Sequence, residues 1–365
     1  MQDEFKISHY DLFISLIISI IGIKSFSYPR EMANLVGTDG WFVTIISGIV
    51  IYLIIYIICK TIKLNGYCDF YTILKNNLGK ILGTIVGLSF VIFELFSISI
   101  NMRTFTEELK MYLLEKTPTE FILIIIIITG VYLVTSGIDT LIRFNEISFF
   151  IMFIPFLIFL LFTLNNADFT NVLPMFNNKP LVYVTSSAKS LYMFQGYEIL
   201  FLLIPILNKR NKIEKTTLKG IIFIVIFYIL VTVFSLAIFS VMESKVLLWP
   251  TITMIKALEI EGSFVERWDG LMMALWVLFF YTTFTNIYYF TADTLKKILK
   301  LKDLKIICLI TAPLIYFIAL YPSNIAVVYQ IITTIIPTYS TIFIIVLPTT
   351  LYIISLIKKN AGGGV

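Results

Sequence analysis

Gly22-Ile23-Lys24-Ser25-Phe26-Ser27-Tyr28-Pro29 interrupts the first long apolar segment of the chain, and Phe194-Gln195-Gly196-Tyr197-Glu198 interrupts another one halfway along. Glycine, proline and charged residues are unfavourable inside a continuous membrane helix. Irregular backbone at membrane depth persists only where it is buried in protein or lines a cavity. Two broken helices at matching positions in the two halves of a chain indicate a transporter-type binding site near the midplane.

The composition is that of an all-α integral membrane protein. Of the 365 residues, 58% are hydrophobic and 14% are charged, which excludes a soluble globular domain. Apolar stretches of the roughly 20 residues that span a bilayer fill most of the sequence. They predict ten transmembrane helices near 11–35, 41–63, 82–112, 119–137, 141–165, 182–207, 217–242, 264–297, 303–321 and 324–357. The net charge of +5 lies in short loops and requires no nucleic-acid partner.

Basic residues set the predicted orientation. Lys and Arg concentrate in the loops after the second, sixth and eighth segments and after the last one, so these loops and both termini are expected to be cytoplasmic. Helix 1 then runs outward and helix 6 runs inward. This predicts a single transmembrane domain over 1–359, built from two inverted five-helix repeats at about 11–165 and 182–357. Residues 360–365 are expected to form a flexible tail.

Neither catalysis nor a cofactor is expected from this sequence. The single histidine is His9, and Cys59, Cys68 and Cys308 form no C-x-x-C pair, so no metal site is predicted. The predicted topology places the cysteines near the cytoplasmic side as free thiols. The chain contains no G-x-x-x-x-G-K-[ST] nucleotide loop and no Ser or Cys paired with His for nucleophilic catalysis.

The two breaks supply most of the candidate ligand-binding residues. A break in helix 1 frees backbone N–H groups, and the N-terminus of a half-helix attracts an anion such as an amino-acid carboxylate. The predicted binding residues are Gly22, Ile23, Lys24, Ser25, Phe26 and Ser27 in the first break and Phe194, Gln195, Gly196, Tyr197 and Glu198 in the second. The alternative is that each break is a kink packed against a neighbouring helix, without a ligand.

Lys24 and Glu198 are the charged residues of the two breaks. A charge at the bilayer centre costs roughly 2.5–3.5 kcal/mol on insertion scales, so such residues are functional and paired by default. One hypothesis is a Lys24–Glu198 ion pair at the midplane that ligand or proton binding perturbs. Glu198 can instead receive the ammonium of a substrate, and the pair can also be purely structural.

Two further helices contribute candidate residues. Glu94, Ile98 and Asn101 share one face of the third segment, where Glu94 is either a proton or ligand group or a hydrogen-bond partner of a neighbouring helix. Thr282 and Thr283 of the eighth segment either meet carbonyls of helix 1 at an ion site or hydrogen-bond between helices. The candidate ion or proton residues are Lys24, Glu198, Glu94, Thr282 and Thr283.

Several motifs occur in the order found in one family. They are Gly22 with Tyr28-Pro29-Arg30, Leu113-Leu114-Glu115-Lys116-Thr117-Pro118, Gly196 with Glu198, Leu248-Trp249-Pro250-Thr251 with Glu266-Arg267, and Phe290-Thr291-Ala292 with Leu295-Lys296-Lys297. Through these motifs, nearly the whole chain resembles the spore germination permeases. These are the B subunits of nutrient germinant receptors, within the amino acid–polyamine–organocation superfamily.

The resemblance implies a fold, a role and partners. The fold is the ten-helix, LeuT-like arrangement with broken helices 1 and 6. The role is binding of a small germinant, often an amino acid, beside Gly22 to Ser27 and Gln195 to Glu198, in the inner membrane of a spore. The partners are an A-type membrane subunit and a C-type lipoprotein.

Lys24 departs from the family pattern, in which a small residue is expected in the first break. A lysine here either fills part of the pocket or replaces a bound cation with its own charge. Two alternatives to the receptor subunit therefore stay open. They are an autonomous proton-coupled amino-acid transporter, and a scaffold or pore-forming subunit with a vestigial pocket.

Overall fold

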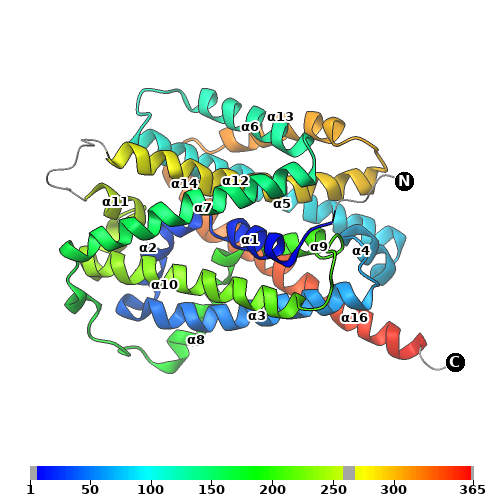
Figure 1. Cartoon of the computed structure of the whole chain (residues 1–365), viewed down its shortest axis with the longest axis horizontal. Coiled ribbons are helices and arrows are strands. Elements are labelled where there is room, and N and C mark those ends of the chain that lie inside the picture. Colours follow the sequence, from blue (N-terminus) through cyan, green and yellow to red (C-terminus); the bar gives the residue numbers. More distant parts are fainter. Residues whose placement is uncertain (1–5, 258–267, 363–365) are drawn as a thin grey trace.

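Helices form almost all of the chain (Figure 1). The computed structural model describes residues 6–257 and 268–362, and within these ranges the one extended pairing is a bridge between Ile7 and Leu207. The predicted all-helical fold is thereby confirmed.

Helix 1 is broken where the sequence predicts it. α1 (His9–Ile20) is capped at its N-terminus by Ser8, whose side chain accepts hydrogen bonds from the first turn. It ends where Ile21 adopts an extended conformation. α2 (Lys24–Val36) continues the span after Gly22 and Ile23. Pro29 lies inside α2 and cannot donate to the carbonyl of Ser25, so Thr251 donates its hydroxyl to that oxygen instead, at 3.1 Å.

Helix 6 is broken as well. It consists of α8 (Pro180–Ser190), η4 (Leu191–Phe194), η5 (Tyr197–Ile199) and α9 (Leu200–Leu203), and the chain changes direction at Gln195 and Gly196. Gly196 has φ +130°, a conformation that side chains rarely adopt.

The remaining long helices lie over the other predicted segments, and the short elements η1 (Gly37–Asp39), α4 (Phe70–Leu78), η3 (Phe169–Val172) and α11 (Pro250–Lys256) lie between segments. The other elements are α3 (Gly40–Leu64), α5 (Lys80–Tyr112), α6 (Thr119–Thr135), α7 (Ile138–Thr163), η2 (Leu164–Asn166), α10 (Ile213–Val246), α12 (Trp268–Leu299), α13 (Leu304–Leu320), α14 (Ile325–Gln330), η6 (Ile331–Ile335), α15 (Ile336–Ser340), η7 (Thr341–Val346) and α16 (Leu347–Gly362). Thus α14 to α16, with η6 and η7, make up the last predicted segment.

Several helices meet the length and hydropathy of a membrane span. Five described stretches qualify by themselves: Lys24–Leu64, Lys80–Tyr112, Ile138–Asn166, Ile213–Val246 and Ile325–Asn360. α12 from Leu275 and α13 qualify together as a sixth, bent by 116°. The chain is therefore an integral membrane protein, whereas the count of ten spans and the boundaries of the inverted repeats stay predictions.

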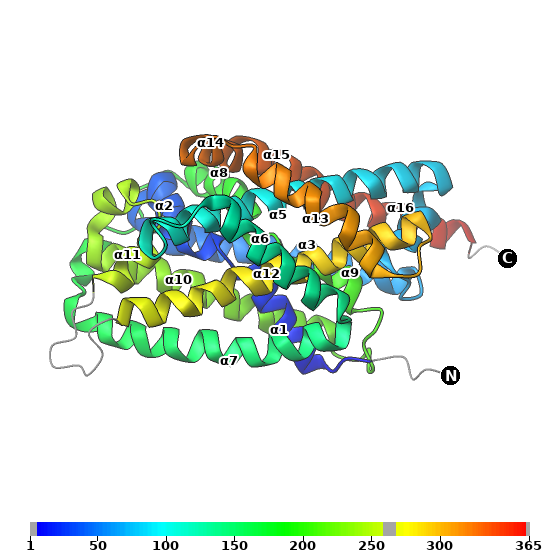
Figure 2. The same cartoon turned by 90° about the horizontal axis from the view of Figure 1, so that it is seen from above.

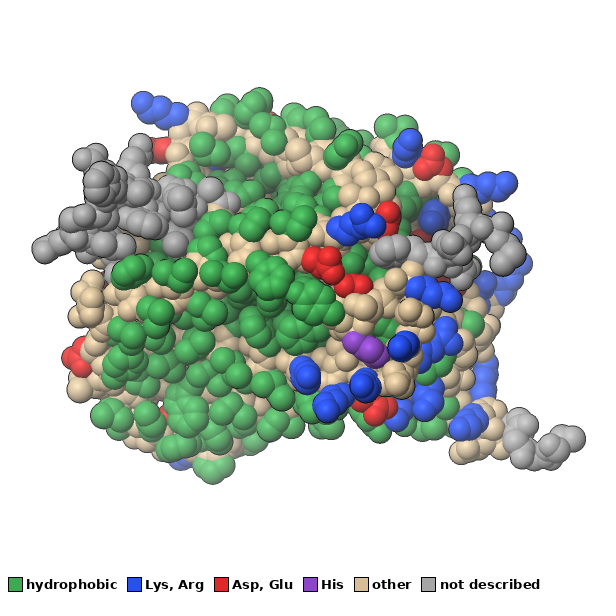
Figure 3. All heavy atoms as spheres, viewed as in Figure 1, with side chains coloured by type: hydrophobic (Ala, Val, Ile, Leu, Met, Phe, Trp, Pro, Cys, Tyr) green, Lys and Arg blue, Asp and Glu red, His purple; other side chains and the backbone are tan. Residues whose placement is uncertain are grey.

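The two broken helices lie at the centre of the bundle. α1 packs against α7, α10 and α12, and α2 packs against α3, α8 and α10. Figure 2 shows α12 between α7 and α5, and α12 packs against both. On the face shown in Figure 3, Lys and Arg gather at the end where both termini lie, and the middle is largely hydrophobic. This distribution agrees with the predicted placement of the termini beside the basic loops.

Candidate functional site

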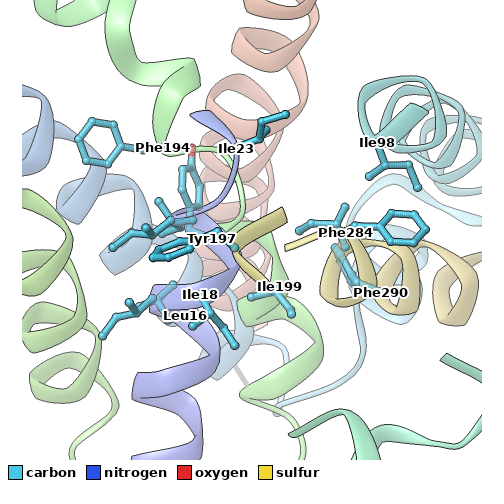
Figure 4. Packing of buried hydrophobic residues seen from close by; sticks show 14 of the residues in the cluster. Leu16, Ile18, Ile23, Ile98, Phe194, Tyr197, Ile199, Phe284 and Phe290 are labelled. Atoms are coloured by element: carbon cyan, nitrogen blue, oxygen red, sulfur yellow. The ribbon is translucent and has the colours of Figure 1, made fainter. Parts of the chain in front are cut away.

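The two breaks touch each other through backbone. A Cβ atom added to Gly196 would lie 2.1 Å from the carbonyl oxygen of Ser19, near the end of α1. Figure 4 shows Phe194 and Tyr197 of the second break beside Ile18 and Ile23 around the first. Only glycine at position 196 allows this approach, so the sequence of helix 6 fixes its distance from helix 1.

Neighbouring helices satisfy the carbonyls that the breaks release. Tyr228 of α10 donates its hydroxyl to the carbonyl oxygens of Met193 (3.2 Å) and Ile20 (3.4 Å), one from each break. Thr283 of α12 donates to the carbonyl of Ile18 at 2.7 Å. These bonds hold the irregular backbone in place, because an unpaired carbonyl at this depth is costly.

Lys24 is the first charged group of the site. Its ammonium donates to the carbonyl oxygen of Tyr192 at 2.9 Å and to Oε1 of Gln195 at 3.0 Å. Among the described residues it forms no ion pair. The hypothesised direct Lys24–Glu198 ion pair is therefore wrong for this arrangement. The side-chain partner of Lys24 is the neutral amide of Gln195, which lies three residues before Glu198.

Gln195 joins three helices at this point. Besides accepting from Lys24, its amide nitrogen donates to the hydroxyl of Ser97 in α5 at 3.1 Å, and Ser340 of α15 donates to its Oε1 at 3.4 Å. Gln195 thereby connects Lys24 of the first break to α5 and α15 by hydrogen bonds. The sequence marked Gln195 as a candidate but gave no indication of these contacts.

The two carboxylates near Lys24 are in different situations. Oε2 of Glu198 accepts a hydrogen bond from the backbone N–H of Gly196 at 2.8 Å, and Oε1 has no partner in the described part of the chain. Both carboxylate oxygens of Glu94 in α5 are buried and have no hydrogen-bond partner there either. Glu94 therefore has the greater unused capacity to accept a hydrogen bond.

A small cavity, here called the central cavity, lies between the breaks, α5 and α12. About 30 Å³ of it is open to the centre of a water molecule, enough for roughly two waters. It is lined by Ile20, Gly22, Ile23, Lys24, Glu94, Ser97, Ile98, Asn101, Gln195, Phe280, Thr283, Phe284 and Ile287. In this arrangement an amino acid does not fit without movement of lining side chains, of which Lys24 is the longest.

About half of the predicted site residues line the central cavity. Gly22, Ile23, Lys24, Glu94, Ile98, Asn101, Gln195 and Thr283 do so, whereas Ser25, Phe26, Ser27, Phe194, Gly196, Tyr197, Glu198 and Thr282 do not. Ser25 turns back to donate to the carbonyl of Gly22 at 2.6 Å, and Tyr197 donates to the carbonyl of Ile344 at 2.9 Å. Ser27 instead lines a second cavity, described below, and Ser25 and Tyr197 hydrogen-bond to backbone carbonyls.

The sequence reasoning missed five lining residues: Ile20, Ser97, Phe280, Phe284 and Ile287. The last three recur at i, i+4 and i+7, and together with Thr283 they mark one face of α12. That spacing is visible in the sequence, but nothing there distinguishes this face from a lipid-facing one.

The threonines of α12 act as hydrogen-bond donors. Thr282 donates to carbonyls of its own helix at Leu278 and Phe279, and Thr283 joins α12 to α1 through Ile18. Thr283 therefore makes an interhelical hydrogen bond, whereas Thr282 bonds within its own helix. No cluster of three metal-ligating side chains occurs among the residues that the structure describes.

A carboxylate network ties the outer ends of both broken helices. Asp39, just after α2, accepts hydrogen bonds from the backbone N–H groups of Phe176 (2.6 Å) and Asn177 (3.1 Å), from Nδ2 of Asn178 (3.0 Å) and from the hydroxyl of Tyr183 in α8 (2.8 Å). Because Asp39 is fully buried, these contacts make the outer halves of helices 1 and 6 one structural unit.

Comparison with known proteins agrees with this architecture. The family model described as "Spore germination protein" matches residues 6–328. Spore germination protein A2 of Bacillus subtilis (strain 168) is 26% identical over 324 residues, covering 88% of each chain. Spore germination protein B2 of the same organism is 24% identical over 365 residues, covering 100% of this chain and 99% of the relative. Spore germination protein GerLB of Bacillus cereus is 27% identical over 315 residues, covering 84% and 83%.

Two solved transporter structures share the fold. One is Mhp1, a nucleobase-cation-symport-1 family transporter in a closed conformation with bromovinylhydantoin bound. It has TM-score 0.68 and 14% identity, covering 93% of this chain and 78% of that one. The other is a Na⁺-coupled sialic acid symporter in a substrate-bound outward-open state. It has TM-score 0.68 and 11% identity, covering 94% and 79%. At these identities the likeness establishes the LeuT-like fold alone. Because the family model matches residues 6–328, which is most of this chain, the chain belongs to the spore germination permease family.

Proposed function

We propose that this chain is the membrane subunit of a spore germinant receptor, which binds a small nutrient at the central cavity and signals germination. One observation carries the proposal: Lys24, Gln195 and Glu94, from helix 1, helix 6 and helix 3, converge on one cavity between the two breaks. The names of the relatives and the transporter fold support it.

An amino acid is the ligand that best matches the charges around the cavity. Lys24 offers an ammonium for a carboxylate, and Glu94 offers a carboxylate without a hydrogen-bond partner for an ammonium. A ligand carboxylate would replace Tyr192 and Gln195 as acceptors of the Lys24 hydrogen bonds. Because those two residues belong to helix 6, binding would release helix 6 from helix 1. A ligand shifts such an equilibrium only by its differential affinity for the two arrangements.

A germination signal from this subunit would require partner proteins and a defined membrane location. The proposed partners are an A-type membrane subunit and a C-type lipoprotein, in the inner membrane of the spore with both termini in the cytoplasm. The basic residues gathered at the end that carries the termini support this orientation.

Thermal unfolding of the purified full-length chain in the presence of each common amino acid tests the proposal. A ligand at 100 times its dissociation constant stabilises the folded state by about 2.7 kcal/mol, and we expect at least one amino acid to raise the Tm. Lys24→Met and Glu94→Gln should weaken that response about tenfold or more, because each removes a charge-assisted hydrogen bond. The exposed residues Lys116 and Glu120 provide matched controls as Lys116→Met and Glu120→Gln. If none of the amino acids raises the Tm, the chain is better explained as a scaffold subunit.

The buried carboxylates favour a second candidate, an autonomous proton-coupled amino-acid transporter. Glu94 and Glu198 both lie close to the breaks and have carboxylate oxygens without partners in the described residues, so either can carry a proton. Uptake of a labelled amino acid into liposomes that contain this chain alone, driven by a pH gradient, would support the transporter. Binding without uptake would support the receptor subunit.

A further inference from the structure

A second cavity lies on the outer side of Lys24, away from the end that carries the termini. It is called the outer cavity here, and its wall includes Glu31, Asn101, Thr104, Glu108, Trp249 and Tyr329. Lys24, Ile23 and Asn101 line both this cavity and the central one, so these three residues separate the two spaces.

Glu108 of α5 is the unexplained group in the outer cavity. Its side chain is buried, with 3% of the residue exposed. The indole N–H of Trp249 is directed toward the carboxylate, but neither carboxylate oxygen has a hydrogen bond of normal geometry among the residues described. A buried carboxylate without a partner carries a large desolvation penalty. The penalty is offset when the carboxylate binds a cation, an ammonium group or a proton.

Glu31 of α2 brings a second carboxylate to the same cavity. Tyr329 of α14 donates its hydroxyl to Oε1 of Glu31 at 2.5 Å, which orients this carboxylate. Two carboxylates and an aromatic wall containing Trp249 therefore surround one small space.

The nearby basic side chains make their contacts outside the cavity, although Nη1 of Arg30 and Nε of Arg103 have no hydrogen-bond partner among the described residues. Arg30 stacks on the ring of Tyr329 at 4.4 Å and donates Nε to the carbonyl of Lys245, and it does not line the cavity. Arg103 pairs with Glu107 at 2.9 Å. Lys24 reaches the cavity floor, but its ammonium is bonded to helix 6. Neither Glu31 nor Glu108 forms an ion pair with a described residue.

We propose that the outer cavity is a binding site for a primary organic ammonium, held by Glu108 and Glu31 beside Trp249. The ammonium donates N–H groups to the two carboxylates, and the aromatic wall suits its carbon atoms and its charge. About 30 Å³ of the cavity is open to the centre of a water molecule, which suits a small ammonium head and not an entire amino acid. The outer cavity and the central cavity share Lys24 as a lining residue. A nutrient that enters from the outer side would therefore place its amino group in the outer cavity before it reaches the central cavity.

This last role rests on the proposed function, whereas ammonium binding itself does not. Methylammonium chloride is the probe, because it has no carboxylate for Lys24 and fits the small cavity. The full-length chain is titrated with methylammonium, and the Tm is followed at constant ionic strength with sodium chloride and tetramethylammonium chloride as comparisons. We expect half-saturation in the roughly millimolar range and a weaker response to tetramethylammonium, which has no N–H to donate.

Three variants decide between the possible outcomes. Glu108→Gln should weaken the methylammonium response about tenfold or more, and Glu31→Gln should weaken it to a smaller extent. Glu107→Gln removes the same charge one residue away, outside the cavity, and should leave the response unchanged. If Glu108→Gln does not fold, Glu108→Asp keeps the charge and should still respond.

Two results would overturn the outer site. One is the absence of any shift by methylammonium beyond that of sodium, which would mean that Glu108 simply holds a proton. The other is loss of the methylammonium response in Glu94→Gln with retention in Glu108→Gln, which would place the ammonium in the central cavity. The first result leaves amino-acid binding at the central cavity untouched, and the second would agree with the ammonium role of Glu94 there, so either one overturns the outer site without overturning the proposed function.

Discussion

Replacement of Gly196 by alanine tests the contact between the two breaks on which the whole site depends. Gly196 has φ +130°, and a Cβ at this position would lie 2.1 Å from the carbonyl oxygen and 2.6 Å from the carbonyl carbon of Ser19. The unfavourable backbone conformation costs about 1–3 kcal/mol, and the overlap costs about 1–3 kcal/mol more. We therefore expect Gly196→Ala to lower the free energy of unfolding by about 2–6 kcal/mol.

Gly66 supplies a control that separates the two contributions. It has φ +70°, but an added Cβ would meet no atom within 4 Å. Gly66→Ala should therefore cost only the backbone term of about 1–2 kcal/mol. Both variants add the same methyl group at a glycine with positive φ, so a loss at Gly196 well beyond the cost at Gly66 reports the approach of helix 6 to helix 1 together with the less favourable φ of +130°.

Thermal unfolding of both variants in the same detergent, followed by intrinsic tryptophan fluorescence, measures the difference. A stability loss of 1 kcal/mol lowers the Tm by about 2 °C in a chain of this size. Gly196→Ala should lower the Tm at least about twice as much as Gly66→Ala. Equal shifts would mean that the broken helices do not touch, and the central cavity as described here would not exist.

Two further measurements test the outer end of the site and the orientation of the chain. Asp39→Asn should lower the free energy of unfolding by about 3 kcal/mol in the same thermal assay, because it places an N–H₂ group among four donors. Asp168→Asn, in an outer loop where the carboxylate accepts only from Thr170, should cost far less, and equal losses would contradict the network. A membrane-impermeant maleimide should label the partly exposed Cys68 in inside-out vesicles and not in right-side-out ones, while the buried Cys59 and Cys308 stay unlabelled. Labelling in right-side-out vesicles would reverse the orientation.

The sequence was sufficient for the fold because the signals that define it are local. Short stretches of sequence are enough to recognise the apolar segments of spanning length, the glycine of each break and the asymmetry of Lys and Arg. The structure breaks helix 1 before Lys24 and helix 6 at Gly196, within the predicted stretches. Local patterns therefore identified both breaks.

The cavity lining was less predictable because it depends on the rotation of each helix. Ser97 and Phe284 line the central cavity, whereas the predicted site residues Tyr197 and Thr282 do not. The long helices α3, α5 and α6 are apolar around most of their circumference, so periodicity does not separate the face toward the cavity from the face toward lipid. Only the packing of the helices resolves that choice.

The partner of Lys24 was predicted wrongly because the backbone of the second break decides which side chains face the first. Gln195 and Glu198 would share a face if helix 6 were regular, since they are three residues apart. Instead Gln195 is extended and Gly196 has φ +130°, so Gln195 meets Lys24 and Glu198 turns back onto the N–H of Gly196.

This difference matters for ligand binding. A ligand carboxylate that had to separate a buried Lys24–Glu198 ion pair would face a penalty of about 3–5 kcal/mol for the charge left behind. In the observed arrangement it replaces two neutral acceptors, the carbonyl of Tyr192 and the amide of Gln195. Each neutral hydrogen bond contributes only about 0.5–1.5 kcal/mol. A lysine held by neutral groups therefore remains available to an anionic ligand, which a lysine held by a carboxylate would not.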